Sequence, residues 1–456
     1  MKNRSLFYLL GASFVTSACT TGENINYERP NIIFILSDDM GIGDLSIYGG
    51  QILPTPHIDK MAQEGIFFTQ YYSASPVSSP SRAGLLTGKH PANWNITSYL
   101  QTRAGNKDAE MVDYLTVKAP TLPRALKEGG YKTAHFGKWH LGGGRDVYDA
   151  PSIKEYGYDT YSSTYESPDP DPLLTATDWI WSKEDSVKRW NRTAYFVDKT
   201  LEFLKENKGK PCFINLWPDD VHTPWIGNKE EMDLAPKGTN SKENLKTVLK
   251  EYDYQIGRLL SSLKDEGLDK NTIVIFTSDN GAAPSFQHIR NNGLRGQKAS
   301  LFEGGIRMPF IVWGPKANVP VGKIDTTTVI SALDMFHSLC AITDTHVPKQ
   351  FDSDGEDMSK AMLGAPQDRE KSIFWEYKRN DSQAFPKAMG ADASPNVAIR
   401  NGDWKLLVNQ NGSDVMLFNL KEDQFERNNV KDKYPEITED LQNQAIGWRN
   451  SLPNLK

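Results

Sequence analysis

Four oxygen-bearing side chains follow two apolar stretches of the sequence at matching positions: Asp38, Asp39, Asp279 and Asn280. The first pair comes directly after residues 31–37 (NIIFILS), and the second pair follows residues 272–277 (TIVIFT). Adjacent carboxylates repel each other and need a cation or strong hydrogen-bond donors to stay ionised together. Oxygen ligands suit a hard cation, Ca²⁺ or Mg²⁺. Turn residues at strand ends are the alternative interpretation, but the matching positions favour a metal site.

A serine-rich segment, Ser78-Ser79-Pro80-Ser81-Arg82, is typical of the start of a helix. Proline is favoured in the first helical turn, and the free N–H groups of a helix N-terminus attract anions. We therefore expect Ser78 to stand just ahead of an anion-binding helix end. An ordinary capped helix start is the alternative for this segment taken alone.

Apolar runs suggest the strands that must position these residues. Continuous runs suit strands buried in a parallel sheet, and they occur at 31–37, 212–217, 272–277 and 309–313. Helical patterns lie between them, at 56–65 with Gly65 as the stop, 121–129 with Thr121 as the N-cap, and 242–265. This alternation predicts an α/β fold with a mostly parallel sheet, whose ligands bind beyond the carboxyl ends of the strands.

The chain changes character after about residue 345, where a polar, irregular stretch begins. Short strands are predicted beyond it at 373–377, 396–400, 403–408 and 415–419, followed by a helix at 435–450. We therefore predict a catalytic domain over residues 30–345 and a smaller α+β domain over residues 346–456.

The N-terminus has the form of a targeting segment. Lys2 and Arg4 precede the mostly apolar residues 6–15, and small residues lead to Cys19. This pattern predicts a signal peptide over residues 1–18, then a lipidated Cys19 and a polar tether to residue 29. Export without a lipid and a retained anchor are the alternatives. We see no other segment apolar enough to cross a membrane.

Composition excludes several classes of protein. The 456 residues include 52 Lys+Arg and 58 Asp+Glu, a net charge of −6, and no basic run, so nucleic acid is a poor partner. Three cysteines (Cys19, Cys212 and Cys340) are too few for a disulfide-stapled scaffold or a cysteine-rich zinc module.

The segment around Ser78 resembles the signature of type I sulfatases, which here comprises SSPSR at 78–82 and LTG at 86–88. Further motifs of this family follow in order: GYKT at 130–133, GKWHLG at 137–142, HTP at 222–224, SDNG at 278–281, RGQK at 295–298 and EGGIRMP at 303–309. Any one motif could arise by chance, but the ordered set is specific. The resemblance implies an alkaline-phosphatase-like fold, with a mostly parallel central sheet flanked by helices and a smaller α+β C-terminal domain.

The same resemblance implies the chemistry of the site. Residue 78 would be oxidised to Cα-formylglycine (3-oxoalanine), and serine at this position resembles the bacterial branch matured by an anaerobic radical SAM enzyme. One Ca²⁺ would be held by Asp38, Asp39, Asp279, Asn280 and residue 78. One hydroxyl of the aldehyde hydrate would attack sulfur, and the other would later allow sulfate to be expelled.

The remaining implied roles belong to side chains in the matched motifs. Arg82 would orient residue 78, and Lys138 and Lys298 would bind sulfate oxygens. His140 would act as the base on the hydrate, and His222 would protonate the leaving oxygen of the substrate.

These inferences predict a carbohydrate sulfatase that acts on a sulfated glycan or oligosaccharide. We expect a periplasmic or cell-surface lipoprotein of a Gram-negative bacterium, in contact with the membrane only through its lipid anchor. A phosphonate or phosphate ester hydrolase of the alkaline phosphatase superfamily is one alternative. A non-catalytic glycan-binding surface lipoprotein, with Ser78 unmodified, is the other.

Two assignments near these motifs favour a structural role over a substrate contact. Trp217 ends an apolar strand and is interpreted as a core residue, although it could stack on a sugar. The polar stretch with His288, Arg290 and Asn291 is interpreted as a surface loop, although it could form a substrate subsite.

Overall fold

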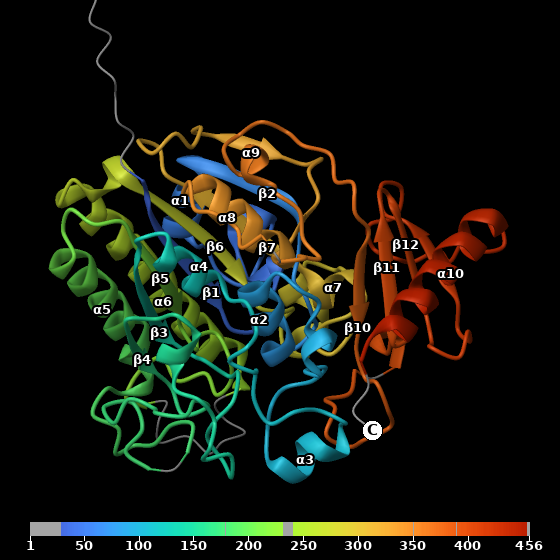
Figure 1. Ribbon diagram of the computed structural model, residues 1–456, viewed down its shortest axis with the longest axis horizontal. Coiled ribbons are helices and arrows are strands. Elements are labelled where there is room, and N and C mark those ends of the chain that lie inside the picture. Colours follow the sequence, from blue (N-terminus) through green and yellow to red (C-terminus); the bar gives the residue numbers. More distant parts are fainter. Residues whose placement is uncertain (1–28, 178, 231–239, 350, 389, 454–456) are drawn as a thin grey trace, which may run out of the picture.

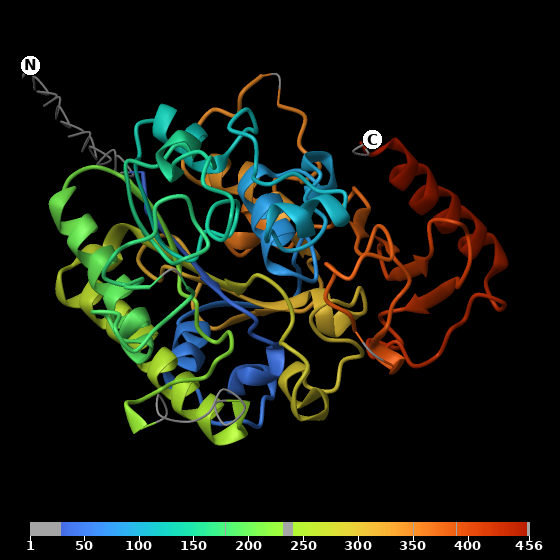
Figure 2. The same ribbon diagram turned by 90° about the horizontal axis from the view of Figure 1, so that it is seen from below.

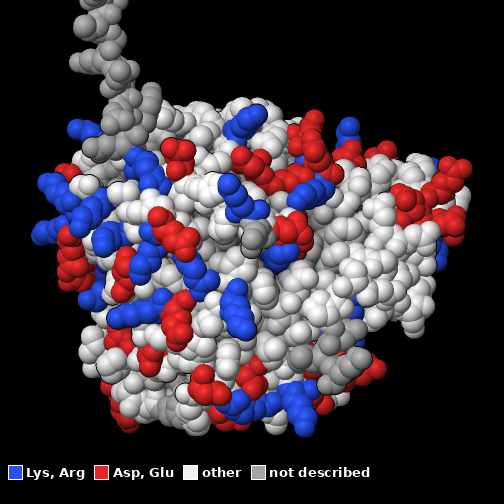
Figure 3. Space-filling view, in the orientation of Figure 1, with Lys and Arg blue, Asp and Glu red and all other residues white. Residues whose placement is uncertain are grey.

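The computed structural model describes residues 29–453, apart from residues 178, 231–239, 350 and 389. The predicted signal peptide, Cys19 and all of the tether except Arg29 lie outside the described residues. The described chain forms a large layered α/β unit and a smaller unit built on a second sheet (Figure 1). On the face shown in Figure 3, basic and acidic side chains are intermingled over the larger unit.

The large sheet has β1 near its centre, in the order β4-β3-β5-β1-β6-β7-β2-β8, with β9 also paired to β2. Its strands are β1 (Asn31–Ser37), β2 (Gly65–Tyr72), β3 (Lys132–Gly137), β4 (Thr160–Ser163), β5 (Cys212–Trp217), β6 (Thr272–Ser278), β7 (Arg307–Trp313), β8 (Lys323–Asp325) and β9 (Ile330–Ser331). All pairings are parallel except those of β7 with β6 and β2. The predicted mostly parallel sheet is therefore confirmed.

Helices cover both faces of this sheet (Figure 2). One face packs against α1 (Pro56–Gln63), α5 (Arg192–Glu206) and α6 (Lys242–Asp265). The other packs against α2 (Ser78–Thr87), α4 (Leu122–Glu128), α8 (Met335–Ile342) and α9 (Ser359–Met362). Alternate residues of β1 enter the two cores, which explains why its sequence is apolar throughout. No helix in the described part of the chain combines the length and apolar character needed to cross a membrane.

The smaller unit is a four-stranded antiparallel sheet with one long helix. Its strands are β10 (Ile373–Glu376), β11 (Val397–Asn401), β12 (Trp404–Val408) and β13 (Met416–Asn419). Helix α10 (Pro435–Ser451) packs on one face, and α7 (Glu303–Ile306) of the larger unit packs on the other. The buried Lys405 ammonium lies 2.9 Å from both Glu303 and Glu426, so an ion cluster joins the small sheet to the larger unit.

Two predicted elements differ from the structure in an informative way. The helix expected over 56–65 ends at Gln63, and Gly65 instead begins β2. A Cβ atom on Gly65 would collide with the Val312 carbonyl oxygen, so glycine is required by the close approach of β7. The run at 309–313 lies in β7, which is antiparallel to its neighbours. The sequence could not show this direction, because an apolar run indicates only that a strand is buried. The other predicted elements begin and end within two residues of those observed.

Thr121 precedes α4 as predicted, but its hydroxyl does not cap the helix. The hydroxyl instead donates to the Tyr156 carbonyl oxygen at 2.6 Å. A tertiary contact has replaced the local capping interaction.

Candidate active site

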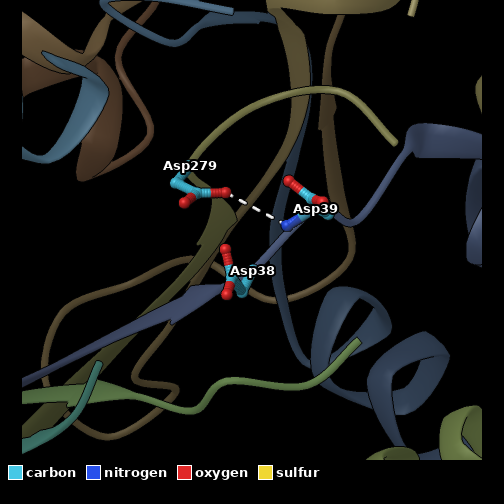
Figure 4. Close-up of side chains that lie close together, drawn as sticks. All are labelled: Asp38, Asp39 and Asp279. Carbon is cyan, nitrogen blue, oxygen red and sulfur yellow. Dashed lines mark hydrogen bonds between the residues drawn. The ribbon is translucent and has the colours of Figure 1, made fainter. Parts of the chain in front are cut away.

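The acidic residues meet because β1 and β6 are parallel neighbours whose last residues lie opposite each other. Asp38 and Asp279 therefore leave the same edge of the sheet side by side. The Asp39 backbone N–H donates to Asp279 Oδ1 at 3.1 Å, and the Asn280 amide donates to Asp39 Oδ1 at 2.7 Å. Each of the three carboxylates offers an oxygen within 4.8 Å of the others (Figure 4).

Helix α2 brings Ser78 to this cluster. Ser78 is the first residue of the helix rather than the residue ahead of it, and its side chain is buried. Its hydroxyl lies 3.3 Å from Asp38 Oδ1 and 3.3 Å from Asn280 Oδ1. The structure thus brings together all five residues that were predicted to hold a metal.

Burial and neighbouring charges act differently on the carboxylates of this cluster. Burial would raise the pKa of Asp38, but neighbouring positive charges, Lys138 foremost, hold it well below its usual range. Burial raises the pKa of Asp279 to about 6, which Arg82 opposes and the charges of Asp38 and Asp39 reinforce. Three buried carboxylates and one amide, all offering oxygen, therefore fit an additional hard cation.

Three basic side chains surround the same cluster. Arg82 is fully buried, lies 2.8 Å from Asp279 Oδ2 and has its guanidinium carbon 5.2 Å from the centre of the Trp217 ring. The ammonium of Lys138 lies 2.8 Å from Asp38 Oδ2, and that of Lys298 lies 2.7 Å from Asp39 Oδ2. These contacts place positive charge on the pocket side of the acidic cluster.

The ring of His140 is held by one hydrogen bond through Nε2, and its buried Nδ1 has no hydrogen-bond partner among the described residues. Its Nε2 lies 3.0 Å from the Leu100 carbonyl oxygen, so the ring proton sits on Nε2 and donates there. Its Nδ1 therefore keeps a lone pair, 3.5 Å from Glu166 Oε2. Burial lowers the pKa of His140 to about 3, so the ring is neutral at ordinary pH.

His222 presents the opposite ring atom to the pocket. Its Nδ1 lies 2.6 Å from the Thr223 carbonyl oxygen, which places a proton on Nδ1. Its Nε2 lies 3.4 Å from the Lys298 ammonium and 3.5 Å from Asp39 Oδ2. His140 and His222 thus offer different ring nitrogens to one site.

A pocket of about 250 Å³ contains Ser78, both lysines and both histidines. Its wall also includes residues that the sequence did not single out: Tyr99, Arg145, Glu166 and Arg189. Arg145 lies 2.9 Å from Glu166 Oε1. These residues come from connecting segments without a recognisable spacing, so the sequence alone carried no signal for them.

The prediction that Trp217 is a core residue and the prediction of a surface loop around Arg290 had different outcomes. Trp217 is buried, as expected for a core residue. The assignment of a surface loop was wrong for Arg290 and Asn291, which are both buried. Arg290 lies 2.7 Å from Asp44 Oδ2 and donates to the Asp39 carbonyl oxygen at 2.9 Å. It thereby supports Asp39, whose φ of 59° is unfavourable for a residue other than glycine.

The sequence of the chain is similar to known proteins over most of its length. The Sulfatase family model matches residues 30–345. The N-acetylgalactosamine-6-O-sulfatase of Bacteroides thetaiotaomicron is 30% identical, over 91% of this chain and 92% of its own length. The N-acetylgalactosamine-6-sulfatase of Canis lupus familiaris is 32% identical, over 81% of this chain and 72% of its own length.

Solved structures share the fold of this chain over most of its length. A structure described under metabolism of multiple glycosaminoglycans by Bacteroides thetaiotaomicron has a TM-score of 0.73 and 26% identity, covering 91% of this chain and 98% of the other. The crystal structure of Ps i-CgsB in complex with k-i-k-neocarrahexaose has a TM-score of 0.75 and 25% identity, covering 94% of each chain.

Proposed function

The chain belongs to the sulfatase family of sulfuric ester hydrolases, and from this premise we propose that it removes O-sulfate groups from glycans. One observation carries the proposal: Lys138 and Lys298 line one pocket with Ser78, beside a buried oxygen cluster that Arg82 supports from within the protein. Such a site suits a single tetrahedral anion. N-acetylgalactosamine 6-sulfate is the first candidate substrate, because the relatives named above act on that sulfated sugar.

We propose that one Ca²⁺ is held by Asp38, Asp39, Asp279, Asn280 and residue 78. The donor set is made of oxygens, which Ca²⁺ prefers to the nitrogen and sulfur ligands typical of zinc. When bound, the cation would neutralise the carboxylates and polarise the sulfate ester.

Ser78 is proposed to mature to formylglycine through an anaerobic radical SAM enzyme. Its hydrate would supply a hydroxyl nucleophile for attack on sulfur. The buried Arg82, which contacts Asp279 and the Lys138 carbonyl oxygen, would keep the cluster beside residue 78 in place. Lys138 and Lys298 would donate to sulfate oxygens and stabilise negative charge in the transition state.

The two histidines are proposed to move protons at opposite ends of the reaction. Nδ1 of His140 has the lone pair needed to accept a proton from the nucleophile, since Leu100 fixes the proton of the ring on Nε2. Nε2 of His222 would carry a proton to the leaving oxygen of the sugar. Burial lowers the pKa of His222, and the charge of Asp39, 3.5 Å away, opposes this shift by favouring the protonated form.

The carboxylate of Glu166 lies beside His140, the proposed base, and its effect on that base can be tested. Burial would raise the pKa of Glu166, but the positive charges of Lys138 and Arg145 help to hold it below its usual range, so the group is ionised throughout the working range. Its charge would stabilise the imidazolium that forms when His140 accepts a proton. Glu166→Gln is therefore expected to lower kcat about tenfold and to change KM less. This loss is smaller than the loss expected when the general base itself is removed.

Steady-state kinetics on the matured enzyme measure this effect, with Glu166→Asp as the variant that keeps the charge. The aspartate variant should retain more of the wild-type kcat than the glutamine variant. Equal losses in the two variants, together with equal falls in Tm, would show that Glu166 acts through packing and not through its charge.

We also propose that the chain is exported and carries a lipid on Cys19. The support is the sequence pattern of Lys2, Arg4, the apolar residues 6–15 and the small residues before Cys19.

A panel of defined substrates tests the proposed function. The chain is produced together with a radical SAM maturation enzyme, and released sulfate is quantified for sulfated monosaccharides that differ in sugar and position. We expect turnover of N-acetylgalactosamine 6-sulfate to exceed that of its 4-sulfate isomer. Faster turnover of phosphonate or phosphodiester substrates would replace this function with the alternative hydrolase activity.

A further inference from the structure

Two tryptophans lie beside the candidate pocket, and we propose that they form a platform for a second sugar ring of the glycan. Trp179 is the one exposed tryptophan in the described part of the chain, with 51% of its surface accessible, and Trp181 is partly exposed. The platform rests on the proposed function, because its ligand is the sugar next to the sulfated one.

The hollow that contains these rings adjoins the pocket and shares two lining residues with it. Trp179 and Trp181 line a shallow hollow of about 350 Å³ together with Thr223, Pro224 and Asn240. Thr223 and Pro224 also line the pocket that contains Ser78. The two spaces therefore lie on either side of the residues that follow His222, the residue proposed to protonate the leaving oxygen.

The short segment 179–181 contributes side chains to the lining of both the pocket and the hollow. Ile180 lines the pocket, whereas the tryptophans on either side of it line the hollow. A glycan whose sulfated sugar occupies the pocket would continue past Thr223 and Pro224 onto the two indoles. This arrangement extends the site in one direction and selects a chain of sugars over a single one.

Neighbouring side chains hold the exposed indole in position. The Tyr165 ring centre lies 6.0 Å from that of Trp179, and the Arg145 guanidinium carbon lies 5.8 Å from the same ring centre. Arg145 is itself paired with Glu166 at the pocket wall. A rigid aromatic ring loses little conformational entropy on binding, and its apolar face suits the C–H face of a sugar ring.

Kinetics on two substrates that share one sulfated sugar test the platform. The probes are N-acetylgalactosamine 6-sulfate and a chondroitin tetrasaccharide that ends in this sugar. Trp179→Ala is expected to raise KM for the tetrasaccharide about tenfold, the size of losing the burial of one apolar face, and to change KM for the monosaccharide much less. Trp179→Phe should recover part of the loss, because it keeps an aromatic face.

Tyr254→Ala is the matched control, since Tyr254 is 52% exposed and lies on α6, outside the pocket and the hollow. It should change neither KM. An unchanged tetrasaccharide KM in Trp179→Ala, equal KM changes for the two probes, or wild-type enzyme that turns over neither saccharide would overturn the platform. Turnover of 4-nitrophenyl sulfate is measured alongside, because its absence would mark a failure of the proposed sulfatase chemistry rather than of the platform.

Discussion

Replacing Ser78 with alanine is expected to abolish sulfate release, with kcat/KM falling by about 10⁴-fold or more. Alanine has no oxygen that can be oxidised to an aldehyde, so the nucleophile is lost. Its loss also removes an oxygen 3.3 Å from Asp38 and Asn280 in the proposed cation site. Released sulfate, quantified by ion chromatography, measures the effect.

Ser81→Ala is the matched control for this variant. Ser81 lies one turn further along α2 and, like Ser78, is 2% exposed, so the two substitutions remove equally buried hydroxyls from one helix. Compared with wild type at an equal content of matured residue 78, the Ser81 variant should retain most of the activity, and the Ser78 variant should still bind the sulfated glycan. Substantial turnover by Ser78→Ala would refute the assignment of the nucleophile.

Removing divalent cations is expected to abolish turnover and to destabilise the fold. Without a cation, the carboxylates of Asp38, Asp39 and Asp279 repel one another across less than 4.8 Å in a buried site. A ligand present at about 100 times its Kd stabilises the folded state by about 2.7 kcal/mol. Dialysis against EDTA should therefore lower Tm by about 3 °C or more, and added Ca²⁺ should restore both Tm and activity.

Two variants distinguish the effect of losing a cation ligand from the effect of losing a buried carboxylate charge elsewhere in the protein. Asp279→Asn removes one charge from the cluster and should weaken the dependence of Tm on Ca²⁺. Asp334→Asn should keep that dependence, because Asp334 is equally buried but is paired with Arg369 outside the cluster. Identical Tm and turnover before and after chelation would contradict the proposed cation site.

Much of the fold could be predicted because burial on both faces leaves a strong pattern. Strand β1 contributes alternate residues to two cores, so its whole length is apolar and its ends are easily recognised. Its parallel pairing with β6 then brings Asp38 beside Asp279. This juxtaposition follows from the sequence once both strands are placed in one parallel sheet.

Local patterns failed where tertiary contacts decide the structure. Gly65 reads as a helix stop, yet its small size serves the contact between β2 and β7. Arg290 lies in a polar stretch, yet it is buried against Asp44. Neither partner is close in sequence, so neither contact could be inferred from local composition.

The parts of the site outside the sequence motifs were the least predictable. Glu166 and Trp179 lie on connecting segments whose conformation depends on packing, and neither belongs to a motif that the sequence singled out. The residues proposed to bind sulfate lie in ordered motifs, because the proposed roles require fixed spacing. The residues proposed to contact or lie near the sugar lie in loops, which have no such requirement.

We propose that this sulfatase acts through an oxidised residue 78. Peptide mass spectrometry of an active preparation, produced with its maturation enzyme, tests this proposal. We expect the peptide containing residue 78 to be lighter than its encoded mass by a pair of hydrogen atoms, in a fraction that rises with specific activity. Fully active protein in which residue 78 remains an unmodified serine would contradict it.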